Sequence, residues 1–124
     1  MRLTEKDVIC LSVPFYHCFG MVLGNLNAMS HGAAIVLPDE GFDAHKSMKA
    51  VEEQKCTALY GVPTMFVGMM YEYDKHKFDV SSLRTGIIAG SVCPEPLMRR
   101  IVKDLGIEQM TNCYGMTETS PVTF

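Results

Sequence analysis

Short apolar segments alternate with longer amphipathic ones along the chain. Apolar, partly β-branched runs occupy residues 8–13, 33–37, 57–60 and 85–89, and residues 107–114 predict a last strand. Runs of this kind are typical of parallel strands that are buried on both faces. The intervening segments predict helices over 18–30 and 43–55, one that begins at 64, and one over 94–105. Five strands alternating with four helices predict an α/β fold with a doubly wound parallel sheet.

Helix-boundary residues support this division of the chain. Gly32 and Gly106 follow amphipathic segments where a left-handed C-terminal residue is common. Asp43 precedes the second helix, where its side chain is a good N-cap. Residues 74–82 are polar and predict a connection between the third helix and the fourth strand.

The third predicted helix carries large side chains at helical spacing, namely Phe66, Met69, Met70 and Tyr73. Such a stripe usually packs in a core. The alternative is that it lines a substrate pocket.

Composition and charge narrow the class of protein. The 124 residues are 48% hydrophobic and 20% charged, which predicts one globular domain. A net charge of −3 argues against nucleic-acid binding. Residues 8–38 carry no charge, but proline, glycine and asparagine interrupt them, so we expect a buried strand, helix and strand rather than a transmembrane segment.

Cysteine and histidine spacing indicates neither disulfides nor a metal centre. The five cysteines are odd in number and form no C-x-x-C pair, which favours reduced thiols in an intracellular protein. The histidines at 17, 31, 45 and 76 lack zinc-ligand spacing, so we expect no structural zinc.

Unusual residues follow three of the predicted strands, at 14–17, 90–93 and 114–118. Ligands bind at the carboxyl ends of the strands in parallel sheets. The three segments therefore predict a common site at this edge.

The segment Tyr114-Gly115-Met116-Thr117-Glu118 has the chemistry of a nucleotide site. A purine can lie on the tyrosine ring, and the glycine allows a phosphate to approach closely. The threonine can donate to a phosphate, and the carboxylate can bind Mg²⁺. Equally, the tyrosine can cap the core and Thr117-Glu118 can begin a surface turn.

Two other segments also have two interpretations. Gly90-Ser91 is either a plain strand-to-helix turn or a turn whose amides lie beside a purine. His17 is either a hydrogen-bonded loop residue or a residue at the border of a substrate tunnel. Neither a Walker A pattern nor G-x-G-x-x-G occurs, which argues against ordinary ATPase and dinucleotide sites.

The chain resembles the adenylate-forming superfamily along its length. Residues 114–118 are similar to its Y-G-x-T-E motif, and residues 14–21 to its aromatic and histidine segment beside the acyl pocket. Val62-Pro63-Thr64 and Ala89-Gly90-Ser91 fall in the family's order. The continuation 119–124 resembles the fatty-acyl-CoA synthetase branch.

This resemblance implies roles for individual residues. Thr117, Glu118 and His17 would be catalytic, and Glu118 would also bind the metal. The implied nucleotide-binding residues are Gly90, Ser91, Asn112, Cys113, Tyr114, Gly115, Met116 and Thr117.

The resemblance further implies a fatty-acid–CoA ligase that uses ATP, Mg²⁺ and coenzyme A. The family's phosphate loop and its C-terminal lysine are not among residues 1–124, so we expect this chain to be one subdomain of a partial AMP-binding domain. We expect it to be inactive without the remaining subdomains, in a cytoplasmic or mitochondrial enzyme. The alternatives are a non-catalytic α/β module and another adenylate-forming enzyme, luciferase-like or amino-acid-activating.

Overall fold

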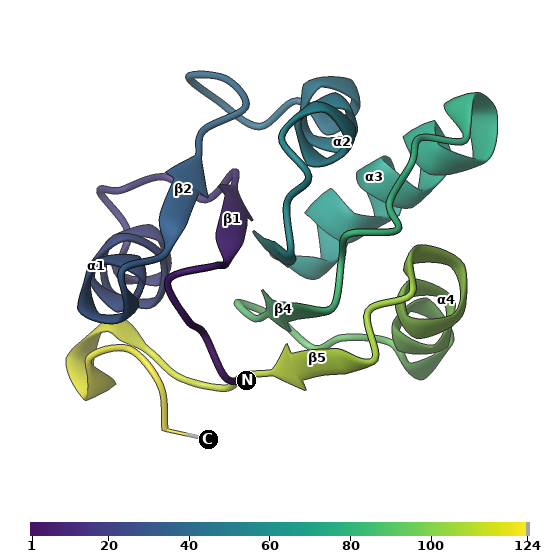
Figure 1. The fold of residues 1–124 in the computed structure, drawn as a ribbon. Helices are drawn as coiled ribbons and strands as arrows, with labels where there is room; N and C mark the ends of the chain where they lie inside the picture. The colour runs from purple at the N-terminus through teal and green to yellow at the C-terminus, as the bar shows by residue number, and fades with distance from the viewer. Residues whose placement is uncertain (124) are drawn as a thin grey trace.

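Five parallel strands form a single sheet in the computed structural model, which describes residues 1–123. The strands are β1 (Val8–Leu11), β2 (Ala34–Val36), β3 (Ala58–Gly61), β4 (Thr85–Ile88) and β5 (Gln109–Asn112). Their order across the sheet is β2-β1-β3-β4-β5 (Figure 1). This is one of the two common doubly wound orders. The doubly wound parallel sheet that the sequence predicted is confirmed, and the order of its strands comes from the structure.

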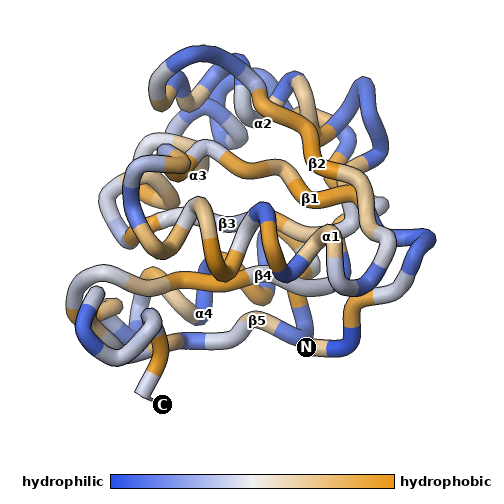
Figure 2. The backbone as a smooth tube through the Cα atoms, turned by 90° about the vertical axis from the view of Figure 1, so that its left-hand side faces the viewer, coloured by the Kyte–Doolittle hydropathy of each residue, from blue (hydrophilic) through white to orange (hydrophobic). Residues whose placement is uncertain are grey.

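The connecting segments are helical. They are the π-helix η1 (Phe19–Leu26), α1 (Asn27–His31), α2 (Ala44–Glu53), α3 (Pro63–His76) and α4 (Glu95–Leu105), and the short 3₁₀-helix η2 (Thr117–Thr119) follows β5. Helix α1 lies on one side of the sheet, and α2, α3 and α4 lie on the other (Figure 1). Hydrophobic stretches run along β1, β2 and β4, whereas the most hydrophilic stretches lie at outer turns (Figure 2).

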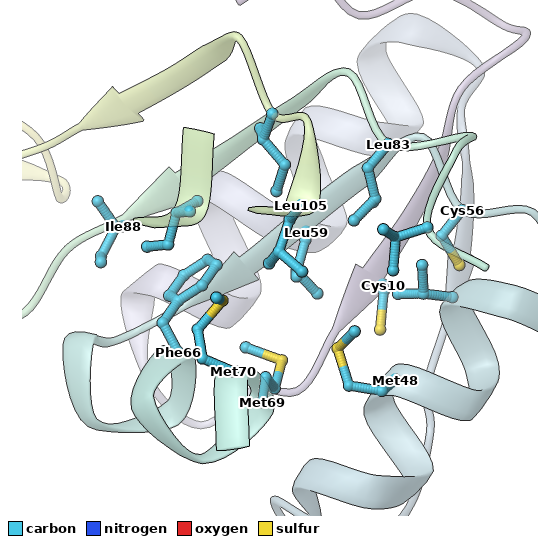
Figure 3. Close-up of a cluster of buried hydrophobic side chains, with 14 residues drawn as sticks. Cys10, Met48, Cys56, Leu59, Phe66, Met69, Met70, Leu83, Ile88 and Leu105 are labelled. Carbon is cyan, nitrogen blue, oxygen red and sulfur yellow. The ribbon is translucent and has the colours of Figure 1, made fainter. Parts of the chain in front are cut away.

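The larger core cluster lies between the sheet and helices α2, α3 and α4. Phe66, Met69 and Met70 of α3 are buried there, next to Met48 of α2 and Leu105 of α4 (Figure 3). The interpretation of the α3 stripe as core packing is therefore confirmed. A second cluster, on the other face, contains Phe19 and Ala28 from η1 and α1.

Helix boundaries agree with the residues that predicted them in several places. The Asp43 carboxylate accepts from the Lys46 amide at 2.7 Å, which confirms the N-cap of α2. Gly32 and Gly106 end α1 and α4 in the left-handed conformation, with φ of 68° and 69°.

Two expectations about local structure were wrong. The segment 18–30 was expected to form one ordinary helix, but it is the π-helix η1 followed by the five-residue α-helix α1. The polar connection was placed at 74–82, but α3 continues through His76. This last turn is closed by the bond from the Lys77 amide to the Tyr73 carbonyl, at 2.8 Å. Polarity alone did not reveal that the backbone continues as helix through residues 74–76.

A buried ion pair joins the amino ends of three strands. Asp7, 2% exposed, lies just before β1 and accepts from the Thr57 hydroxyl at 2.6 Å and from Arg84 Nε at 3.0 Å. Thr57 and Arg84 precede β3 and β4. The Arg84 guanidinium also donates to the Arg2 carbonyl at 2.7 Å, which ties the N-terminal segment to the sheet.

The five cysteines carry free thiols. No helix within residues 1–123 is long and apolar enough to cross a membrane.

Candidate active site

The three strand-end segments meet in one pocket of about 270 Å³. His17 reaches it from the loop after β1, Ala89 and Gly90 from the turn after β4, and residues 113–118 from the end of β5. The sequence predicted this convergence from the carboxyl ends of parallel strands, and the described structure places these segments together.

A second pocket, of about 450 Å³, adjoins the first. Its lining residues are Gly90, Ser91, Val92, Cys93, Asn112, Cys113, Tyr114 and Gly115. Four of these residues, Gly90 and 113–115, also line the first pocket, so they form a wall with a hollow on each side. Each residue to which the resemblance assigned a role lines one of the two pockets or both.

Tyr114 is positioned by the end of β5. The Cys113 amide donates to the Ile88 carbonyl at 2.9 Å, which extends the pairing with β4 beyond the last residue of β5. Tyr114 itself is 60% exposed, so it does not cap the core. An exposed ring at this edge can present a face to a flat heterocycle.

Gly115 is required by the chain itself. A β-carbon there would stand 1.8 Å from the Pro121 carbonyl oxygen, because the segment after η2 folds back against the glycine. The fold-back is held by the bond from the Thr123 amide to the Tyr114 carbonyl, at 2.8 Å. The sequence suggested that this glycine lets a phosphate approach, whereas the structure provides a second, internal reason for it.

Gly90 is the corresponding special position after β4. Its φ of +94° is a conformation that side chains with a β-carbon rarely adopt. A β-carbon would also lie 3.1 Å from Val62 Cγ1. Because the turn is so tight, the backbone of Gly90 and Ser91 remains at the surface of the second pocket.

His17 is held as an acceptor by the start of η1. Its Nδ1 accepts from the Phe19 amide at 3.0 Å, and its own amide donates to the Pro14 carbonyl at 3.2 Å. A neutral ring with Nδ1 as acceptor carries its proton on Nε2. The imidazole therefore has a donor at Nε2.

The hydroxyls of the two threonines in η2 have different surroundings. The Thr119 hydroxyl donates to the Met116 carbonyl at 2.9 Å and accepts from the Met116 amide at 3.2 Å, so it holds the turn. The Thr117 hydroxyl lies 3.8 Å from Cys18 Sγ, which in turn lies 3.8 Å from His17 Nδ1. The Cys18 thiol thus bridges the loop after β1 and the segment after β5.

Glu118 is exposed at the rim of the first pocket. Within residues 1–123 its carboxylate takes part in no ion pair or hydrogen bond. A carboxylate in this state suits a hard cation such as Mg²⁺, which prefers oxygen ligands.

The sequence missed several lining residues of the first pocket. Leu23 reaches it from η1, and Pro121 and Val122 from the segment that folds back. Phe19, which belongs to the segment 14–21 that resembles the border of an acyl pocket, lines it as well. The spacing of four between Phe19 and Leu23 was the available signal for Leu23, but its apolar character also suits a core. The fold-back itself left no signal that could be recognised.

A further hollow, of about 540 Å³, lies at the carboxyl end of β1. It is lined by residues 11–16, by Leu37 and residues 39–42, and by Met65. Residues 14–16 of the first strand-end segment therefore line this hollow, and only His17 of that segment reaches the pocket at β4 and β5.

Comparison with known proteins associates the whole chain with one family. The family model described as "AMP-binding enzyme" matches residues 1–124. The chain is 47% identical over 124 residues to "Acyl-CoA ligase sidI" of Aspergillus fumigatus, covering 100% of this chain and 21% of that protein. It is 48% identical over 121 residues to "Medium-chain acyl-CoA ligase ACSF2, mitochondrial" of Danio rerio, covering 97% and 20%.

Solved structures support the fold. The crystal structure of the anthranilate CoA ligase AuaEII in complex with anthranoyl-AMP is similar with a TM-score of 0.86, at 22% identity, over 97% of this chain and 23% of that one. This chain therefore has the architecture of part of an adenylate-forming enzyme, and it spans about a fifth of the length of the curated relatives.

Proposed function

The chain belongs to the AMP-binding enzyme family, and we propose that it forms part of an acyl-CoA ligase that activates a medium- or long-chain carboxylate with ATP. The observation that supports this proposal is the pair of pockets on either side of Gly90 and residues 113–115. One pocket suits the nucleotide and the other the acyl group. The sequence identity between this chain and two acyl-CoA ligases also supports the proposal.

In this proposal the second pocket holds adenine. The exposed Tyr114 ring stacks on the base, and the tight turn at Gly90 and Ser91 leaves backbone groups beside the purine edge. Asn112 and Cys113 form the floor of the same hollow.

The phosphates then extend toward η2. The Thr117 hydroxyl donates to a phosphate oxygen, and the Glu118 carboxylate holds Mg²⁺. The ion would neutralise part of the phosphate charge. The unpaired state of the Glu118 carboxylate fits a hard cation.

The reaction proceeds in two steps. A carboxylate oxygen of the fatty acid attacks the α-phosphorus of ATP, forming the acyl-adenylate and releasing pyrophosphate. The sulfur of coenzyme A then attacks the acyl carbon, which forms the thioester and releases AMP. Catalysis rests on positioning and charge neutralisation.

His17 borders the reacting carboxylate in the first pocket. Because its Nδ1 accepts from the Phe19 amide, its Nε2–H is a donor that can orient a carboxylate oxygen. Met116 and the apolar Phe19 and Leu23 provide surface for the start of the acyl chain.

We propose that residues 1–124 make up one subdomain of the AMP-binding domain, and that the remaining subdomains complete the site. Alone, the chain binds ATP weakly and does not turn over. We propose that the complete ligase is cytoplasmic or mitochondrial; one relative is described as mitochondrial.

The role of Glu118 can be tested by carboxylate-dependent ATP–pyrophosphate exchange in the full-length ligase. We expect Glu118→Gln to abolish exchange, because the substitution removes the charge that holds Mg²⁺. The matched control is Glu108→Gln, an exposed carboxylate outside both pockets, which should leave exchange unchanged. Undiminished exchange in the Glu118 variant would refute the metal role.

Calorimetric titration of Mg·ATP into the 124-residue chain tests the subdomain proposal. Weak binding that is lost with Glu118→Gln supports it. A folded chain without ATP affinity, in a protein with no exchange activity, would instead identify a non-catalytic module.

A further inference from the structure

Helices α2 and α3 bring together two imidazoles and a carboxylate away from the candidate active site. His45 lies in the first turn of α2, and Glu72 and His76 lie in the last part of α3. One ligand atom from each of the three lies within 4.8 Å of the others. This is the one such group of histidine, cysteine or acidic residues within the described part of the chain.

The separations approach those of a metal coordination sphere. His45 Nδ1 lies 2.9 Å from Glu72 Oε2, and His76 Nε2 lies 3.4 Å from the same oxygen. Ligand atoms at about 2.1 Å from a tetrahedral zinc ion are about 3.4 Å apart. Small rotations of these side chains are therefore enough to place all three around one ion.

The backbone holds the ligands in this arrangement. Glu72 and His76 are four residues apart, so they lie on the same face of α3. Gly68, one turn before Glu72, lies against α2, since a β-carbon there would be 3.4 Å from Ala44 Cβ, at van der Waals contact. The next residue along α2 is His45.

Packing restricts the side chains further. The Phe78 ring has its centroid 5.3 Å from that of His45 and 5.7 Å from that of His76. The Glu72 side chain is only 17% exposed, whereas those of His45 and His76 are 48% and 38% exposed. The carboxylate is thus held in place, and an ion can still enter from solvent.

We propose that His45, Glu72 and His76 form a binding site for a divalent transition metal of the zinc class. Two imidazole nitrogens and one carboxylate oxygen suit zinc, whereas Mg²⁺ prefers oxygen ligands alone. Water completes the coordination. His45 Nδ1 binds the ion through its lone pair, so the proton that it shares with Glu72 in the metal-free protein moves to Nε2 or to solvent.

The bound ion would link the start of α2 to the end of α3. A ligand that binds only the folded chain stabilises it, so zinc raises the unfolding temperature. The sequence did not indicate this site, because His45 and Glu72 are 27 residues apart and belong to different helices.

The experiment titrates the metal-free 124-residue chain with Zn²⁺ in competition with a chromophoric chelator, and follows thermal unfolding by circular dichroism. We expect one Zn²⁺ per chain, with affinity at least about tenfold lower in His45→Gln and in His76→Gln. His31→Gln is the matched control, since His31 is an exposed histidine of another helix, and it should bind like the parent. Millimolar Mg²⁺ should not displace the zinc.

Several results would overturn the proposal. One is that the chain does not bind Zn²⁺ at micromolar concentration, and another is that all three histidine variants bind it with equal affinity. A third is that alkylation of the thiols abolishes binding while the histidine substitutions do not, which would place the ion on the cysteines. The circular dichroism spectra of the variants show whether each one is folded. Because both histidines are substantially exposed, we expect the metal-free variants to unfold at the temperature of the metal-free parent.

Discussion

The buried pair of Asp7 and Arg84 yields a prediction about stability and pH. The change is Asp7→Asn, which removes the charge while preserving shape. In the folded chain the carboxylate accepts from the Thr4 amide at 2.8 Å, from the Thr57 hydroxyl at 2.6 Å and from Arg84 Nε at 3.0 Å. An asparagine cannot accept all of these bonds, and it leaves the guanidinium without its counter-charge.

The magnitude follows from the pKa of Asp7. Burial raises the pKa, but the hydrogen bonds from Arg84, Thr57 and Thr4 lower it more, so it falls from 3.8 to about 2. One pKa unit corresponds to about 1.4 kcal/mol, so the shift corresponds to about 2.5 kcal/mol. Because the Arg84 side chain is 37% exposed and partly screened by solvent, we expect about 2 kcal/mol.

The sign of the pH dependence is set by the lowered pKa. Above about pH 5 the carboxylate of Asp7 is ionised in both the folded and the unfolded chain, and the full contribution to stability is present. As the pH falls from 4 toward 2, the unfolded chain binds a proton first, so this contribution is lost.

The assay is urea unfolding of the parent and of Asp7→Asn at several pH values between 2 and 7. We expect the parent to be about 2 kcal/mol more stable than the variant above pH 5, and this difference to shrink as the pH approaches 2. A difference that stays constant across this range would refute the argument. Asp39→Asn serves as the control, since its partner Lys46 is on the surface, and we expect no measurable loss of stability.

Two further substitutions test the core and the site wall. Phe66 is 0% exposed, so Phe66→Ala leaves a cavity in the core. We expect it to lower the free energy of unfolding by about 3–5 kcal/mol, which urea unfolding can measure. Gly115→Ala should displace the segment that folds back, since its β-carbon would stand 1.8 Å from the Pro121 carbonyl oxygen. The Thr123 amide should then lose its protection from hydrogen exchange, which NMR can measure.

Each of these substitutions has a control in the same protein. Val67→Ala truncates the next side chain of α3, which is 56% exposed, and should cost much less than Phe66→Ala. Gly41→Ala places a β-carbon with no atom within 4 Å and should leave the protection of Thr123 unchanged. Equal effects in a variant and its control would contradict the assigned packing.

Much of the fold could be predicted from local patterns. The apolar runs at 8–13, 57–60 and 85–89 correspond to the inner strands β1, β3 and β4, because a strand buried on both faces must be apolar along its whole length. The edge strands β2 and β5 were also expected, but they are only partly buried. Asp43 and the glycines at 32 and 106 marked helix ends. The Asp43 side chain caps the first turn of α2, and each glycine adopts the left-handed conformation directly after its helix, so both signals are local in the sequence. The end of α3 was misplaced because residues 74–76 are polar, and polarity alone does not separate an exposed last turn of helix from a connection.

The candidate site was only partly predictable. Parallel strands place their carboxyl ends at one edge, so the residues at 17, 90–91 and 112–118 were expected together, and they line adjoining pockets. The acceptor state of His17 and the fold-back against Gly115 depend on backbone groups whose positions are set by tertiary structure.

The sequence by itself determined the order of the strands and helices, the family and the motif at Tyr114 to Glu118, because these depend on residue type and spacing along the chain. Only the tertiary structure decided which distant residues meet. Cys18 approaches Thr117 across 99 positions, and His45 approaches Glu72 across 27. Such pairs depend on how closely the loops and helices pack, and that distance is set by many side chains at once.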